Sequence, residues 1–224
     1  MVDLAKWLDA ALRIRLGAGG EQTARRAQVI AAAAQAIDEA GPAVSMTRIA
    51  ELADIPRPHI YRYVENRETL EAEVARLASS DLVQRVRPHF TRPGLPYEVV
   101  HGVLTPIIEW AAEHPNLYRF IAAQQQTKAL HRVRMGRTRF LDEIVDATSA
   151  YLRPTELVGD APDGVLASVI GMADAGIIWW LDHKDETPDE LIARLARQVT
   201  VVLTDALKQL GLEVPADMVF NPQG

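Results

Sequence analysis

The sequence of 224 residues contains no cysteine, and this absence excludes whole classes of structure. Without thiols the chain can form neither a disulfide framework nor a thiolate metal site, and the lack fits a reducing cytoplasm. We also find no apolar run approaching the roughly 20 residues that a bilayer-spanning helix needs. The N-terminus has acids among its apolar residues and no cleavage-site pattern, so we expect no signal peptide. The expectation is a soluble, cytoplasmic protein without a membrane partner.

An excess of basic charge is missing too. The chain has 24 Lys and Arg against 30 Asp and Glu, a net charge of −6. Residues 1–70 hold nine of each sign, and the remaining 15 basic and 21 acidic side chains lie in residues 71–224. This balance argues against a uniformly basic coat for nucleic acid. A neutral N-terminal head can still bind DNA if its positive charge faces one way.

No segment alternates apolar and polar residues as a strand does, and there is no internal repeat. Apolar residues instead recur at helical spacing, which predicts an all-α fold. In the first part we expect a helix at 24–41 after an N-cap at Thr23, a helix after Ser45, a short helix at Arg57–Val64, and a helix capped by Asn66. The later predicted helices cover residues 97–114, 116–126, 127–153, 164–183 and 188–211.

These helices suggest three parts. Residues 1–22 form an N-terminal extension, 23–72 a three-helix helix-turn-helix head that binds DNA, and 73–224 a larger helical bundle for ligand binding and dimerisation. In a helix-turn-helix the second helix enters the major groove. That helix is Arg57–Val64 here, with Ile60 as its buried anchor. Two prolines open it. With Pro56 at the cap and Pro58 in the first turn, neither removes a helical hydrogen bond.

Side chains rotated away from Ile60 are candidates for base edges, because Arg can fork onto guanine. Tyrosine hydroxyls and flanking arginines suit phosphates, which fix register rather than sequence. The candidate DNA contacts are Thr47, Arg48, Arg57, His59, Tyr61, Arg62, Tyr63 and Arg67. The alternative is that a tyrosine anchors the helix and the arginines form a solvated face.

The stretch "SMTRIAELADIPRPHIYRYVENRETL" resembles the DNA-binding segment of the TetR family of bacterial transcriptional repressors. The residues that fit the pattern are Ile49, Ala50, Ala53, Tyr61, Tyr63, Glu68 and Leu70. The departures are Asp54 for glycine, Ile55 for valine, Pro56 for serine and Val64 for phenylalanine. The resemblance covers about residues 24–72. It implies a homodimer on a near-palindromic double-stranded operator, and a small-molecule effector that releases it.

The body offers a dimer surface and a ligand cavity. The last two predicted helices, at 164–183 and 188–211, carry small residues and a broad apolar stripe, which suits a four-helix homodimer interface. Packing within one chain is the alternative. Pockets often lie between bundle helices. The candidate ligand-binding residues are His101, Trp110, Tyr118, Phe120 and Phe140, although aromatic side chains at helical spacing also form ordinary core.

No motif for catalysis stands out. We find no nucleophile elbow, zinc helix or dinucleotide loop, so we expect no enzyme, cofactor or metal site. Two alternatives keep the same head: a regulator without a ligand, and an activator. A third is a helical small-molecule-binding protein or enzyme whose head does not bind DNA.

Overall fold

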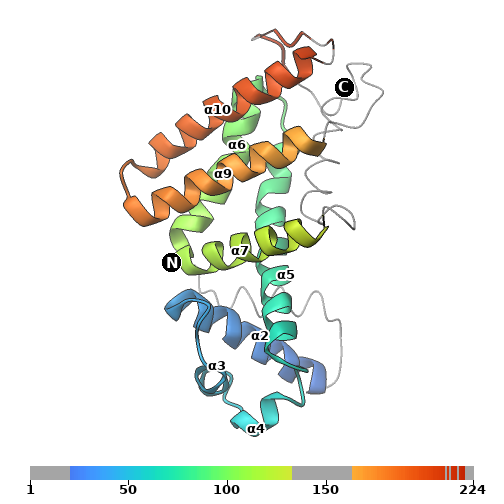
Figure 1. Cartoon of the computed structure of the whole chain (residues 1–224), viewed down its shortest axis with the longest axis vertical. Helices are drawn as coiled ribbons and strands as arrows, with labels where there is room; N and C mark the ends of the chain where they lie inside the picture. The colour runs from blue at the N-terminus through green and yellow to red at the C-terminus, as the bar shows by residue number, and fades with distance from the viewer. Residues whose placement is uncertain (1–20, 133–162, 210, 212, 216, 220–224) are drawn as a thin grey trace. The chain divides into compact units, whose positions relative to one another are not determined.

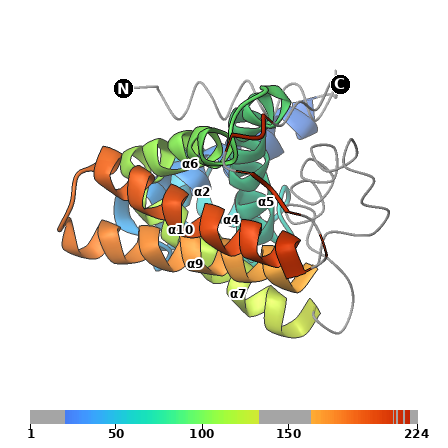
Figure 2. The same cartoon turned by 90° about the horizontal axis from the view of Figure 1, so that it is seen from above.

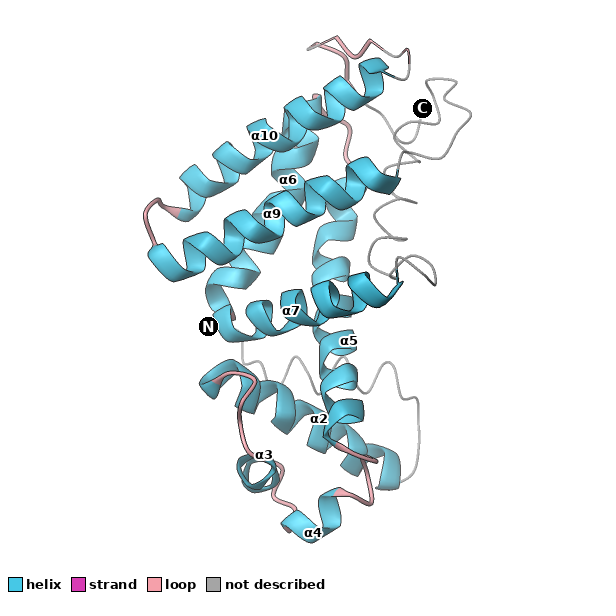
Figure 3. Cartoon of the chain, in the orientation of Figure 1, coloured by secondary structure: helices cyan, strands magenta, loops and turns pink. Residues whose placement is uncertain are grey.

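The computed structural model describes residues 21–132, 163–209, 211, 213–215 and 217–219. In this part of the chain every regular element is a helix and no strand is present (Figure 3), so the predicted all-α fold is confirmed. Most of the predicted N-terminal extension lies outside the described residues. So do Phe140 and most of the predicted helix at 127–153.

The elements follow one another with short connections (Figure 1). They are α2 Glu21–Ala40, α3 Met46–Leu52, α4 Arg57–Ile60, α5 Arg67–Val86, the 3-10 helix η1 Arg87–Thr91, α6 Pro96–Glu113, α7 Pro115–Arg132, α9 Asp163–His183 and α10 Pro188–Gln209. The predicted break between Gln126 and Thr127 is wrong, because α7 continues through it to Arg132. Neither Pro nor Gly stands there, and a run of glutamines does not end a helix.

The chain divides into two compact units. The first contains the described residues up to Asp81 together with Glu113–Thr127, and the second contains Leu82–Ala112 and the described residues from Lys128 onward. In the first unit α2 packs on α3, and α3 on α4. Its core includes Val29 and Ile30 of α2, Ile49 of α3 and Leu70 of α5, all fully or almost fully buried.

In the second unit α9 and α10 lie side by side along their length (Figure 2). Leu191 and Leu195 of α10 and Ile177 of α9 are buried. The helices approach closely at Gly176, where a Cβ would lie 2.9 Å from Cδ2 of Leu195. Trp110 of α6 is fully buried in the same unit.

Helix α9 corrects one expectation from the sequence. Its segment Gly164–His183 has the length and apolar composition of a membrane-crossing helix, and 28% of its most apolar window is buried. The prediction that no such segment exists was wrong because Asp174 and Asp182 interrupt the run without lowering its average much. The core helix of a soluble protein can have the same length and composition.

Candidate nucleic-acid interface

The helix-turn-helix consists of α3, α4 and the turn between them, all in the first unit. Ser45 caps α3 as predicted, because its Oγ accepts a hydrogen bond from the Arg48 N–H at 3.2 Å. Ile49 is buried on the inner side of α3. At the other end, Nε2 of Gln28 on α2 donates to the Ala53 carbonyl at 2.7 Å. Helix α3 is therefore fixed at both ends.

Asp54 lies in the turn and has a φ of 49°, in the left-handed region that glycine enters without steric cost. It stands where the TetR pattern has glycine, so the backbone keeps the conformation for which that glycine is suited. The next residue, Ile55, is buried and donates its N–H to the Ala50 carbonyl at 3.1 Å. The turn thus retains a glycine-type geometry without glycine.

Helix α4 begins as the sequence predicts. Pro56 is its N-cap, without a side-chain hydrogen bond, and Pro58 lies in the first turn. The carbonyl of Pro56 accepts from the His59 N–H at 2.7 Å. Pro58 removes no helical hydrogen bond, because N–H groups of the first turn have no intrahelical partner.

The predicted end of α4 at Val64 is wrong, because the helix stops at Ile60. The chain continues in turns, in which Arg62 N–H donates to the His59 carbonyl at 3.1 Å and Tyr63 N–H to the Ile60 carbonyl at 2.9 Å. These hydrogen bonds join residues three positions apart, so they wind the backbone more tightly than the four-residue bonds of an α-helix. The predicted anchor Ile60 is nevertheless buried, at 0% exposure, and so is Val64, at 3%, so the turns are held to the core on both sides.

Three cationic or titratable side chains of this segment face solvent. Arg57, His59 and Arg62 are exposed. Within the described part of the chain, none of these three side chains forms a hydrogen bond or an ion pair. Tyr61 is also exposed, with 50% of its surface accessible, whereas Tyr63 is half-buried. The segment therefore presents side-chain donors that no other described residue uses.

The flanking candidates differ in this respect. Thr47 is exposed on α3. Arg48 is exposed but lies 3.3 Å from Glu39 and 3.7 Å from Glu51 through its guanidinium. Arg67 donates to a carboxylate and two backbone carbonyls, at distances of 2.6–2.7 Å. Sequence reasoning assigned Arg57 and Arg62 to base edges and the flanking Arg48 and Arg67 to phosphates, and it could not see that the two flanking arginines are engaged within the protein.

The candidate ligand-binding residues are mainly buried. Trp110 lies in the second unit with no exposed surface, and Tyr118 and Phe120 lie on α7 in the first unit, 2% and 4% exposed. His101 of the second unit is partly exposed, and its Nδ1 lies 3.5 Å from Oγ1 of Thr105.

A second histidine in the second unit was not singled out by the sequence. His89 of η1 lies against α6, with its Nδ1 3.2 Å from where a Cβ on Gly102 would be. Burial, and to a lesser degree Arg92, lower the pKa of His89, against a smaller opposing effect of Glu109. Its neutral form is therefore favoured more than in water.

Sequence reasoning also missed a buried polar cluster in the first unit. Nδ1 of His114, at the junction of α6 and α7, lies 2.8 Å from Oδ2 of Asp38 on α2. Nδ2 of Asn116 donates to the Asp38 carbonyl at 2.9 Å. His114 is 7% exposed. The partners lie more than 70 residues apart, so no local pattern could have paired them.

Comparison with known proteins connects these features to one family of folds. No protein-family model matches the sequence, and no curated protein matches it. Solved structures do. A TetR-family transcriptional regulator from Streptomyces coelicolor is 21% identical over 89% of this chain and 92% of its own, with a TM-score of 0.63.

Two further structures carry more specific names. The fatty acid degradation regulator FadR from Bacillus halodurans is 15% identical over 82% of this chain and 97% of its own, with a TM-score of 0.61. RolR, in complex with resorcinol, is 22% identical over 87% of this chain and 97% of its own, with a TM-score of 0.59. At such identities the likeness establishes the fold. The resemblance to the TetR family is thus confirmed as a shared fold.

Proposed function

We propose that this chain is a TetR-family, sequence-specific, DNA-binding transcriptional repressor. It acts as a homodimer on a near-palindromic operator and is released by a small hydrophobic or amphipathic effector. It is not an enzyme, and it works in the cytoplasm. The observation that carries the proposal is the solvent-facing set of Arg57, His59 and Arg62 on α4 and the turn after it, whose side chains have no partner among the described residues.

The physical reason is the availability of donors. Among the described residues the guanidinium groups of Arg57 and Arg62 have no partner, whereas those of Arg48 and Arg67 bond carboxylates. Guanidinium groups left free on a recognition helix and in the turn after it can fork onto guanine O6 and N7. Tyr61 and Thr47 offer hydroxyls at the edges of the same surface, where phosphates would fix the register.

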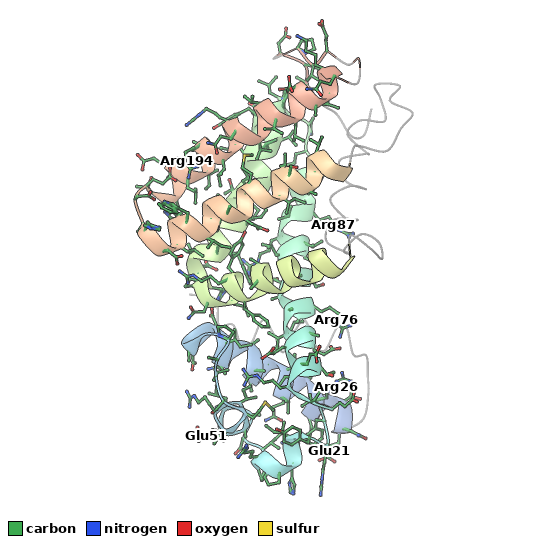
Figure 4. The ribbon with its side chains drawn as sticks, viewed as in Figure 1. Glu21, Arg26, Glu51, Arg76, Arg87 and Arg194 are labelled. Carbon is green, nitrogen blue, oxygen red and sulfur yellow. The ribbon has the colours of Figure 1, made fainter. Side chains whose placement is uncertain are left out.

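The experiment is selection of duplexes from a random-sequence pool, followed by measured affinity for the selected DNA. Arg57→Ala and Arg62→Ala together should weaken binding, by about 1–3 kcal/mol for each arginine that reads a base. A matched control changes Arg76 and Arg87 to Ala, which removes the same charge outside the helix-turn-helix (Figure 4). Equal losses in the two double variants would leave only a general charge effect and would reject Arg57 and Arg62 as base-reading residues.

The effector is proposed on weaker grounds. RolR binds resorcinol, and FadR is named for fatty acid degradation, so this fold accommodates regulators of small-molecule metabolism. For this chain we keep His101, Trp110, Tyr118, Phe120 and Phe140 as the ligand-binding candidates. Titration of tryptophan fluorescence with phenols and fatty acids tests them, because a ligand near Trp110 should change its emission. Release of bound DNA by the same compound separates a regulated repressor from a regulator without a ligand.

The homodimer is proposed to form through α9 and α10. Both helices leave large apolar side chains uncovered: Trp179 is 55% exposed, Val201 66% and Val202 38%. Gly171 and Ala175 lie exposed on α9 and allow close approach of another helix. A second copy covering this face also accounts for the apolar composition of α9 without a membrane. Membrane fractionation of the expressed chain tests that part, since recovery with the membranes would contradict it.

A further inference from the structure

Arg67 is the first residue of α5, and its side chain points back to the loop between α2 and α3. Nη2 donates to the carbonyl of Pro42 at 2.6 Å and Nη1 to the carbonyl of Val44 at 2.7 Å. Nε donates to Oε1 of Glu71, one turn further along α5, at 2.7 Å. Glu71 holds the guanidinium of Arg67 in place, while the two outer nitrogens of that guanidinium bond the loop.

The loop that Arg67 bonds is the entrance to the helix-turn-helix. Gly41, with a φ of 82°, ends α2 and turns the chain into the loop, and Ser45 after it caps α3. The two carbonyls accept no other backbone hydrogen bond in this part of the chain. Arg67 therefore supplies partners for groups that would otherwise rely on water, and it fixes the point from which α3 departs.

These bonds close a loop in the chain. The segment from Pro42 to Arg67 contains α3, the turn and α4, and with them every other candidate DNA contact. Its two ends are joined by one planar, forked side chain. Beneath the guanidinium, side chains of α2, α3 and α5 line a small apolar hollow, among them Ile37, Ile49 and Leu70. The polar bonds thus lie over the core on which the recognition segment rests.

We propose that Arg67 is a positioning residue, which sets the placement of the helix-turn-helix and with it the sequence preference, rather than a phosphate contact. The inference rests on the proposed DNA binding. It reverses the expectation from the sequence, in which Arg67 was one of the flanking arginines assigned to phosphates. Three of its five N–H donors are engaged within the protein, in a geometry that only a fork can reproduce.

The two roles respond differently to lysine. Lysine is a good phosphate ligand as a point charge, but it cannot bond two carbonyls and a carboxylate in one plane. We would compare Arg67→Lys and Arg67→Met for binding to a duplex that the wild-type protein selects from a random pool, and to a scrambled duplex of equal length. Arg76→Lys and Arg76→Met are matched controls on the same helix, because Glu73 is the only partner of Arg76 among the described residues.

If Arg67 positions the reading segment, both variants lose about tenfold in affinity for the selected duplex, the effect of one base contact. Affinity for the scrambled duplex stays within about twofold, because non-specific binding follows charge rather than placement. The salt dependence keeps its slope. Lowered affinity for both duplexes in proportion would instead indicate a smaller folded fraction, which thermal unfolding measures separately, and would reject a role in specificity.

The phosphate role predicts the opposite pattern. Arg67→Lys would bind like wild type, and in Arg67→Met the slope of log affinity against log salt would fall by about 0.9. That result overturns the inference while leaving the proposed function intact. Failure of the wild-type protein to select any duplex overturns the proposed function, and this inference with it. Glu71→Gln serves as a second variant, since it loosens the guanidinium without removing it and should shift the specificity ratio less.

Discussion

At the scale of single residues, the arginines of the head differ in what their guanidinium groups bond. Arg48 and Arg67 have acidic or carbonyl partners, whereas Arg57 and Arg62 have none among the described residues. In the sequence the four differ only in position, with Arg57 and Arg62 on the predicted recognition segment and Arg48 and Arg67 beside it. Partners such as Glu39 or the Val44 carbonyl become visible only when the fold brings them close. The proposed division of the set into DNA-binding and positioning residues therefore needed the structure.

Asp54 offers a test of backbone strain at one position. For a residue with a side chain, the left-handed conformation costs about 1–2 kcal/mol, and within the described ranges the Asp54 side chain makes no hydrogen bond to offset it. Substitution by glycine offsets about 0.4–1 kcal/mol of the gain from relieving this strain, because glycine makes the unfolded chain more flexible. We therefore expect Asp54→Gly to raise the free energy of unfolding by about 0.5–1 kcal/mol, measured by urea titration.

The control for this prediction is Asp54→Ala. Alanine also carries a Cβ, so it should retain the strain and leave stability within about 0.5 kcal/mol of wild type. Equal stabilisation by glycine and alanine would show that loss of the carboxylate, rather than relief of φ, is responsible.

The buried pair of Asp38 and His114 makes a second prediction. The two atoms lie 2.8 Å apart and the histidine is almost fully buried, so removal of either side chain deprives the other of this buried hydrogen bond. Such a loss usually costs about 1–3 kcal/mol. We expect Asp38→Ala and His114→Ala each to lower the unfolding free energy by that amount, and the double variant to lose less than the sum. Additive losses in urea titration would show that the two side chains act independently.

At the scale of elements, most of the fold could be predicted because helix signals are local. Ser45, Pro56 and Gly41 are stop and start signals written in the sequence, and the helices begin or end beside them. The exceptions have local causes too. Helix α4 ends early in three-residue turns, and α7 runs on where only glutamines suggested a break. Contacts between distant segments, such as Gln28 with Ala53, leave no such signal.

The start of α10 allows a prediction on pH. Thr187 and Glu190 form a reciprocal cap: Thr187 N–H donates to Oε2 of Glu190 at 2.8 Å, and the hydroxyl bonds the same carboxylate. These two bonds lower the pKa of Glu190, the backbone bond more than the hydroxyl. Because the pKa of Glu190 is lower in the folded than in the unfolded chain, its carboxylate stabilises the fold at pH values above the unfolded pKa. This contribution is lost as the pH falls through the folded pKa.

We therefore expect Thr187→Ala to raise the pKa of Glu190 part of the way to its ordinary value, since the backbone bond remains. An NMR titration of the carboxyl carbon measures this shift. The variant should also have a lower free energy of unfolding than wild type at neutral pH. This difference in unfolding free energy should narrow at pH values below the usual pKa range of a glutamate. An unchanged pKa would mean that the hydroxyl does not bond the carboxylate in solution.

At the scale of the whole molecule, the charge of the chain agrees with separate tasks for its parts. The acidic excess lies entirely beyond residue 70, so the segment that is proposed to meet DNA carries none of it. Composition alone could locate that neutral head and exclude a basic coat, but it could not show which surface of the body is available to a second copy. The proposed surface depends on which apolar side chains of α9 and α10 stay uncovered after the two helices pack on one another.

The uncovered face makes the last prediction. Val201 lies on α10 with 66% of its surface exposed, beside Val202 on the same helix. Glutamate at position 201 costs little in a monomer, because the site faces water, but in a dimer it would bury an unpaired charge. We expect Val201→Glu to shift the mass measured by sedimentation from dimer to monomer at micromolar concentration, with unfolding still cooperative. Gln84→Glu adds the same charge at an exposed site of α5 and should leave the dimer unchanged. A Val201→Glu protein that stays dimeric would place the interface elsewhere.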